Sequence, residues 1–290
     1  MRDPFVIDSP TCISFSGGRT SAYMLWRVLQ ANDGKLPDET IVCFANTGKE
    51  MEETLEFVRE CGERWAVPIT WLEYQTDAPG YAVVDFHSAS RNGEPFEAII
   101  RKRNYLPNPV TRFCTVELKI RVMFKMLRDT GKLSDGLNMM IGIRADEPRR
   151  VAKMRNGKNS ESVKIINSVP LADAGIGVHE INEFWEAQPF NLRLPTHNGR
   201  TLHGNCDLCF LKPAGQVASL IREVPARGEW WARMEKLAND TFASNKQHGP
   251  GTGWYFRMDR PNYRQMLDFA AAQGDMFDPD EPGIECFCGE

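Results

Sequence analysis

The apolar and polar positions in the first half of the chain alternate between two periods. Short apolar runs at 11–15, 40–48 and 69–74 have the length and β-branched content of buried strands. From Ala22 onward, and again across 55–65, apolar residues recur at helical spacing. Strands that alternate with helices predict an α/β fold, with a parallel sheet, right-handed crossovers and helices on both faces.

The pattern continues to about residue 195 and then changes. An amphipathic stretch at 116–130 and an apolar strand that leads into charges at 137–147 extend the α/β pattern. Turn formers crowd 196–215, and helical stretches follow near 214–224, 228–240 and 260–273. We therefore predict a nucleotide-binding type of α/β domain over 1–195 and a smaller, mostly helical region over 196–290. Its acidic, proline-containing tail is expected to be mobile unless something anchors it.

Composition narrows the classes of function. The chain has 290 residues, 42% hydrophobic and 26% charged, and a net charge of -4, so any nucleic-acid contact needs a local basic patch. No apolar run is long enough to span a membrane and no leader pattern opens the sequence, so a cytoplasmic protein is expected. In that reducing compartment the eight cysteines serve core packing, metal ligation or thiol chemistry rather than disulfides.

The first predicted strand is followed by the turn SFSGGRTS, which carries more glycine and hydroxyl residues than a reversal needs. Gly17 and Gly18 allow close backbone approach at the start of a helix, whose free amides and dipole attract anions. The other members add donors: Ser16, Arg19, Thr20 and Ser21. This pattern favours a di- or triphosphate site, and the alternative is that these residues only cap the helix.

Two further polar segments follow predicted strands, ANTGKE after the second and GIRADE after the last. Parallel sheets bind ligands at the carboxyl ends of their strands, so one site could collect all three segments.

SFSGGRTS resembles the PP-loop of the ATP pyrophosphatase superfamily. Three more stretches are similar to the branch with 3′-phosphoadenylyl sulfate (PAPS) reductase and the small subunit of ATP sulfurylase: 44–58, FANTGKEMEETLEFV; 112–123, RFCTVELKIRVM; and 142–150, GIRADEPRR. PLADAGIGVHEINEFW, 170–185, is similar to a further segment of that branch. The resemblance covers roughly 10–190 in order.

The resemblance implies one adenine-nucleotide site, for ATP or PAPS, with Asn46, Thr47 and Gly48 near base and ribose. It assigns positive charge near the reacting group to Lys119 and Arg144. Two departures stand out: Arg19 and Thr20 replace the usual Lys and carboxylate, and the tryptophan expected near Gly175 is absent. Asp146 and Glu147 could hold Mg²⁺ or simply pair with arginines.

The cysteines fall into two groups. Cys12, Cys43 and Cys61 lie in apolar runs or on an amphipathic helix and are predicted to be core residues. Cys114 lies in a polar context at a helix start, where the dipole lowers a thiol pKa. Cys206 and Cys209 form a C-x-x-C. Together with Cys114, and with Cys286 or Cys288 to complete the set, they could make a metal site, and a redox pair or a plain turn are the alternatives.

Thiolate ligands permit an iron–sulfur cluster or zinc. The resemblance leans toward [4Fe–4S], although the adjacent Cys-Cys pair of the family's cluster enzymes is missing. GIECFCGE, 283–290, also resembles the E-C-G-x-H terminus of PAPS reductases, which makes Cys286 a candidate nucleophile. Cys286 cannot be ligand and attacker at once, and an idle terminal thiol is the third alternative.

Two reactions are therefore expected: ATP cleavage between the α- and β-phosphates, or thiol-dependent reduction of a sulfonucleotide with a thioredoxin-like or other reductant. A nucleotide-binding regulatory or RNA-thiolation-associated protein with structural zinc is the alternative. The basic stretch of Arg101, Lys102, Arg103 and Arg112, with Tyr105 and Phe113, could bind an anionic substrate or RNA, or be a solvated face, and RNA is the less favoured partner.

Overall fold

A six-stranded sheet forms the centre of the protein in a computed structural model that describes residues 2–157, 164–197, 200–242 and 254–272. Its order is β4-β3-β2-β1-β5-β6, and every neighbouring pair is parallel except β3 and β4. The strands are β1 (Thr11–Ser14), β2 (Thr40–Asn46), β3 (Ile69–Tyr74), β4 (Tyr81–Val84), β5 (Asn138–Ile141) and β6 (Ile166–Ser168). The predicted α/β fold is confirmed.

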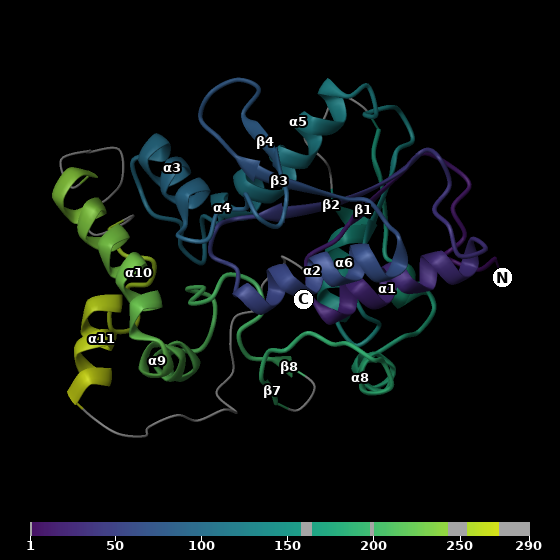
Figure 1. The fold of residues 1–290 in the computed structure, drawn as a ribbon. Helices are drawn as coiled ribbons and strands as arrows, with labels where there is room; N and C mark the ends of the chain where they lie inside the picture. Colours follow the sequence, from purple (N-terminus) through teal and green to yellow (C-terminus); the bar gives the residue numbers. More distant parts are fainter. Residues whose placement is uncertain (1, 158–163, 198–199, 243–253, 273–290) are drawn as a thin grey trace.

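Helices cover both faces of this sheet (Figure 1). α1 (Arg19–Ala31) and α2 (Glu52–Trp65) lie on one face, and α3 (Glu94–Arg103) and α5 (Arg121–Asp129) lie on the other. Right-handed crossovers account for this division, because the chain moves outward from β1 to β3 and then returns to β5 on the far side of β1.

Sequence patterning missed the two edge strands and predicted one continuous helix where the structure has three segments. β4 and β6 are edge strands whose side chains partly face solvent, as the 63% exposure of Val83 and the 48% exposure of Ile166 show. β4 is apolar throughout but only four residues long, and β6 has three residues, of which only Ile166 is apolar. The expected helix over 116–130 is broken into α4 (Phe113–Thr115), a π-helical turn η1 (Val116–Ile120) and α5.

The rest of the chain adds short elements around the carboxyl edge and then a helical group. They are α6 (Pro148–Asn156), α7 (Pro170–Asp173), α8 (Val178–Glu186), the hairpin of β7 (Thr196–His197) and β8 (Arg200–Thr201), α9 (Ala214–Glu223), α10 (Pro225–Leu237), η2 (Ala238–Phe242) and α11 (Tyr263–Ala272). Among the helices described, none combines the length and apolar character that crossing a bilayer requires.

The helices α9, α10 and α11 pack on one another beside the sheet (Figure 1). Trp231 is fully buried there, stacked on Tyr263 at a centroid distance of 5.2 Å and edge-on to Phe256 at 4.9 Å. Trp230 reaches Phe96 of α3 at 5.3 Å, so one apolar core runs from the sheet into this region. The boundary near 195 stays a prediction.

Candidate active site

The turn after β1 has a backbone that only glycine adopts without strain. Gly17 has φ +79°, and a Cβ there would lie 2.8 Å from Thr54 Cγ2 of α2 and 3.1 Å from Phe44. Gly18 then caps α1. The two adjacent glycines therefore let the loop pass tightly against α2 and turn directly into the helix.

Ser21 fixes the shape of this loop. Its hydroxyl donates to the carbonyl of Gly18 at 3.0 Å and accepts from the backbone N–H of Ser16 at 3.1 Å. The Ser16 and Ser21 hydroxyl oxygens are 2.9 Å apart. Ser21 does not line the adjoining cavity, so a direct contact with phosphate stays a prediction for it.

The start of α1 presents unpaired amides to the carboxyl edge of the sheet. Its first intrahelical hydrogen bond runs from Ala22 N–H to Gly18, at 3.1 Å. The N–H groups of Arg19, Thr20 and Ser21 precede it and have no acceptor within the helix. These amides and the helix dipole together favour a bound anion.

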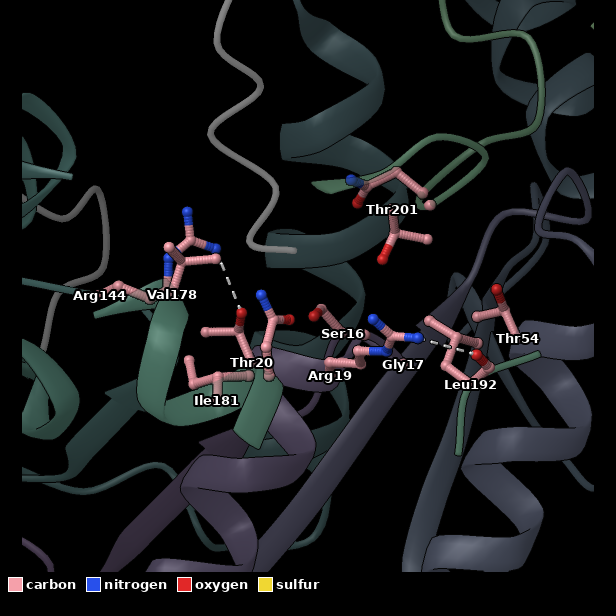
Figure 2. A pocket seen from close by; sticks show the side chains of 14 residues that line it. Ser16, Gly17, Arg19, Thr20, Thr54, Arg144, Val178, Ile181, Leu192 and Thr201 are labelled. Atoms are coloured by element: carbon pink, nitrogen blue, oxygen red, sulfur yellow. Dashed lines mark hydrogen bonds between the residues drawn. The ribbon is translucent and has the colours of Figure 1, made fainter. Parts of the chain in front are cut away.

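A narrow cavity lies directly against this helix start (Figure 2). Ser16, Gly17, Gly18, Arg19 and Thr20 form one side of it, and Arg144, from the segment after β5, forms another. The enclosed volume is about 30 Å³, roughly that of one water molecule. This space is small for a nucleotide phosphate, so we expect side chains of the lining to shift when one binds.

The two cations of the cavity are held from different directions. Arg144 donates from Nη1 to the Thr20 hydroxyl at 3.4 Å (Figure 2). Its Nε donates to Asp146 at 2.9 Å. Arg19 donates from Nε to the Asn191 side chain at 2.9 Å and from Nη2 to the carbonyl of Leu192 at 3.4 Å. Burial lowers the pKa of the Arg19 guanidinium from its ordinary value.

Sequence reasoning missed the opposite wall of the cavity. That wall comes from α2, α8 and the segments around 192 and 201–205, and includes Thr54, Val178, Asn182, Leu192, Thr201 and Asn205. Gly142, the first residue of the GIRADE segment, lies outside the cavity lining. A Cβ there would lie 3.1 Å from Ser21 Cα, so the end of β5 approaches the helix start closely.

The residues predicted near base and ribose lie outside the cavity lining. The Asn46 side chain is buried and donates to Glu73 at 2.6 Å and to the carbonyl of Ser90 at 2.8 Å. The Thr47 hydroxyl donates to Glu50 at 2.8 Å. Gly48 has φ +76° and packs against Gly93. These contacts shape the turn after β2, and a nucleotide role for these residues stays a prediction.

The carboxylates proposed for Mg²⁺ are engaged with cations. Asp146 accepts from Arg144 and, through its second oxygen, from the N–H of Val178 at 3.1 Å. Glu147 accepts from the N–H of Arg144 at 3.0 Å and pairs with Arg150. In these contacts Asp146 and Glu147 pair with arginines, which is the second of the two predicted roles. The two carboxylates also fix the backbone that carries Arg144.

The three cysteines expected in the core, Cys12, Cys43 and Cys61, are buried. Burial raises the pKa of the Cys61 thiol well above its ordinary value. The neighbouring Cys43 thiol, with its Sγ at 3.8 Å, and burial both raise the pKa of the Cys12 thiol well above its ordinary value. The Cys12 and Cys61 thiols are therefore not available as thiolates at neutral pH.

The remaining described cysteines lie beside the turn after β2. Cys206 Sγ is 3.4 Å from the Thr47 hydroxyl, and its backbone bridges to Glu50. Burial and the charge of Glu50 raise the pKa of Cys206, while Lys119 acts against them. Cys114 adds to the rise, so Cys114 and Lys119 both lie within electrostatic reach of Cys206.

A metal centre was predicted from Cys114, Cys206, Cys209 and Cys288. In the part of the chain that the structure describes, no three His, Cys, Asp or Glu side chains gather closely enough to hold a metal. Cys209 closes the C-x-x-C turn, with its N–H 3.2 Å from the carbonyl of Cys206. Cys288, and the proposed nucleophile Cys286, lie outside the described residues.

Known proteins resemble this chain over the region that carries the turns after β1 and β2 and the segment after β5. The profile of the phosphoadenosine phosphosulfate reductase domain matches residues 10–175. An uncharacterized nin region protein of Escherichia phage lambda is 32% identical over 213 residues, which cover 71% of this chain and 67% of the phage protein. An uncharacterized protein of Methanocaldococcus jannaschii is 24% identical over 252 residues, 86% of this chain but 45% of the archaeal one. The chain belongs to the family of the phosphoadenosine phosphosulfate reductase domain.

Proposed function

We propose that the protein is an enzyme that binds ATP with its phosphates against the start of α1 and cleaves the bond between the α- and β-phosphates. The observation that carries this proposal is the convergence of Arg19, Arg144 and the first amides of α1 on one cavity. The family to which the chain belongs supports an adenine nucleotide as the ligand.

The arrangement suits the charge changes of this reaction. An oxygen nucleophile would attack the α-phosphorus, and the bond to the bridging oxygen would break, so that pyrophosphate leaves with the electron pair. Negative charge then grows on the leaving group, where positioned cations and amides stabilise it most. Arg144 is oriented by Asp146 at 2.9 Å, so little ordering remains to be done when the nucleotide binds.

Sulfonucleotide reduction is the second candidate, and family membership favours it. It would need a thiolate that attacks the sulfur of the nucleotide. Of the cysteines that the structure describes, none lines the cavity, and the pKa of Cys206 is raised. This candidate therefore depends on Cys286, with a thioredoxin-like reductant to restore the thiol.

The two candidates differ in their products. Purified protein is incubated with ATP and Mg²⁺ for pyrophosphate release, and with PAPS and a thiol for sulfite release. We expect pyrophosphate release that survives Cys286→Ser and is lost in Arg144→Ala. Sulfite release that Cys286→Ser abolishes would replace the ATP reaction by the reductase, and binding of either nucleotide without turnover would leave a regulatory or RNA-thiolation-associated role.

An iron–sulfur cluster or zinc stays part of the proposal, with Cys114, Cys206, Cys209 and Cys288 as ligands. The described thiols do not form a ligand set by themselves, so no chemical step is assigned to a metal. Anaerobic purification followed by metal analysis tests it: iron with a brown absorption supports the cluster, and zinc supports a structural site.

A further inference from the structure

A second hollow lies on the face of the sheet opposite α1 and α2, between α3 and α5 and over the end of β3. Its volume is about 540 Å³. That volume falls within the roughly 300–1,000 Å³ of pockets that hold small molecules. We call it the α3–α5 hollow, and it shares no lining residue with the cavity at α1.

The lining of the α3–α5 hollow is strongly basic. Five cations and one carboxylate surround it: Lys102, Arg103, Arg121, Lys125, Arg128 and Glu117. The basic stretch noted in the sequence thus supplies only part of the charge, and α5 supplies the rest.

Glu117 organises two of these cations and leaves the excess charge in place. Its side chain is 9% exposed and pairs with Arg103 of α3 and with Arg121 at 2.6 Å. Both guanidiniums are therefore held in fixed positions across the hollow. The lining carries five cations and one carboxylate, so an anion that enters reduces the repulsion among the cations.

Lys125 shows this crowding most directly. Burial, followed by the charges of Lys102 and Arg121, lowers the pKa of its ammonium group, with Asp129 acting in the opposite direction. A methyl group on Gly80 would collide with the Lys125 ammonium, so the lysine is held between α5 and the turn before β4. An anion beside Lys125 would reverse the shift.

Tyr74 gives an independent indication of a ligand. This residue, at the end of β3, lines the hollow and is 5% exposed. Among the residues that the structure describes, its buried hydroxyl has no hydrogen-bond partner. Buried hydroxyls are normally paired, and a polar group of a bound molecule would supply the missing partner. Phe124 adds a second aromatic ring to the lining.

We propose that the α3–α5 hollow is a second binding site, for a small molecule that carries two or more phosphate groups and an aromatic ring, such as a nucleoside polyphosphate. The phosphates meet the cations of α3 and α5, and the ring system packs on Tyr74 and Phe124. A nucleic-acid strand shares this phosphate chemistry. A hollow of this volume, with a buried hydroxyl in its lining, fits a small ligand better than an extended strand.

Calorimetric titration of the full chain tests this site, with ATP, inorganic tripolyphosphate and a single-stranded RNA 20-mer as probes. We expect ATP to bind at two independent sites in the wild type. Gly17→Ala removes the site at α1, and Lys125→Gln weakens only the other, by roughly 5- to 10-fold for the loss of one phosphate contact. Lys132→Gln, an exposed lysine just after α5, is the matched control and changes neither.

Tyr74→Phe gives a readout that a structural role would not. Because the hydroxyl is unpaired in the ligand-free protein, this change leaves the thermal midpoint unchanged or raises it, while it weakens ATP at the hollow several-fold. Tripolyphosphate binds there more weakly than ATP, since it lacks a ring to stack.

Three results overturn the proposal. The first is a single ATP site in the wild type. The second is a second site whose affinity for ATP changes in neither Lys125→Gln nor Tyr74→Phe. The third is RNA that displaces ATP from the hollow and binds the hollow more tightly than ATP does. In the first two cases Gly17→Ala shows whether the site that binds ATP is the one at α1, so a failure of this proposal is distinct from a failure of the proposed function.

Discussion

The indole Nε1 of Trp185 donates a 2.9 Å hydrogen bond to the backbone carbonyl of Arg19, the first residue of α1. The ring is fully buried between Phe57, at a centroid distance of 5.0 Å, and Phe190, at 5.5 Å. α8 is thereby anchored to the residue that begins the proposed phosphate site. Asn191 and Leu192 lie a few residues beyond Trp185 and accept hydrogen bonds from the Arg19 side chain. One segment therefore positions both the backbone and the guanidinium of Arg19.

Trp185→Phe should keep most of the packing and lose the hydrogen bond. We expect a loss of about 1 kcal/mol in the free energy of unfolding, as for a typical buried hydrogen bond, and a several-fold weaker affinity for ATP. Urea unfolding and calorimetric titration measure the two effects. Trp65→Phe, in the same aromatic cluster, is the control and should leave ATP affinity unchanged; equal affinities in the two variants would contradict a positioning role for Trp185.

Gly17→Ala should abolish nucleotide binding at α1, because the new Cβ meets Thr54 and the backbone has φ +79°. Gly34→Ala is a matched control: Gly34 has the same φ, and a Cβ there would meet no described heavy atom within 4 Å. In both variants alanine must adopt a left-handed backbone conformation, which should lower the free energy of unfolding by about 1 kcal/mol. Only the first should lose ATP in a titration, and retained binding there would place the phosphates elsewhere.

Arg144→Ala should weaken ATP binding by roughly 10- to 100-fold, the range of one to two charge-assisted hydrogen bonds. The salt dependence of binding should also become shallower, because one cation is gone. Arg149→Ala, an exposed arginine five residues on, provides the comparison and should bind ATP as the wild type does. Titrations at low and high salt decide this, and equal losses in both variants would point to a diffuse charge effect.

How far the sequence predicts this site depends on how local each contribution is. The turn of Gly17 and Gly18 follows an apolar strand and precedes a helical period, so a few adjacent residues specify it. Arg144 follows β5 in the same way, and the parallel order of the sheet brings it to Thr20.

The opposite wall of the cavity could not be predicted from the sequence, because packing between segments that are distant in the chain creates it. Thr54 faces the loop only because α2 packs beside Gly17, and Leu192 only because Trp185 is anchored to Arg19. Neither residue type signals an anion site. The edge strands β4 and β6 were missed for a different reason. They are four and three residues long, which is too short to show a clear strand period in the sequence.

Asp207 joins the C-terminal region to the turn after β2, and its loss should be costly. Its buried carboxylate is 3.1 Å from Lys49 Nζ and accepts from Trp231 Nε1 at 2.9 Å. Asp207→Asn leaves the Lys49 charge without its buried counter-ion, so we expect about 3 kcal/mol of destabilisation. Glu229→Gln breaks an exposed pair with Arg264 and should cost under about 1 kcal/mol in the same urea titration. Similar costs for both would contradict an anchoring role.

His203 should make this region sensitive to acid. Burial, with the charges of Lys212 and Arg227, lowers the pKa of His203 from 6.5 to about 4. Below pH 6.5 the unfolded chain gains a proton that the folded chain does not, so stability contributed by the neutral ring is lost as the pH falls toward 4. At pH 5 the loss should reach about 2 kcal/mol relative to pH 8.

Thermal or urea unfolding of wild type and His203→Gln at pH 8 and pH 5 isolates this contribution. The comparison cancels the effect of Glu235, whose pKa burial raises to about 7 and whose contribution to stability runs in the opposite direction. An identical pH dependence in the two proteins would show that His203 is protonated in the fold.

The most direct test of the central claim is a crystal structure of the protein with an ATP analogue that has a methylene group between the α- and β-phosphates. The account predicts phosphate oxygens within hydrogen-bond distance of the amides of Arg19 and Thr20, with Arg144 on the same phosphates and Leu192 shifted to admit them. A nucleotide whose phosphates lie away from the start of α1, while that turn keeps its ligand-free shape, would contradict it.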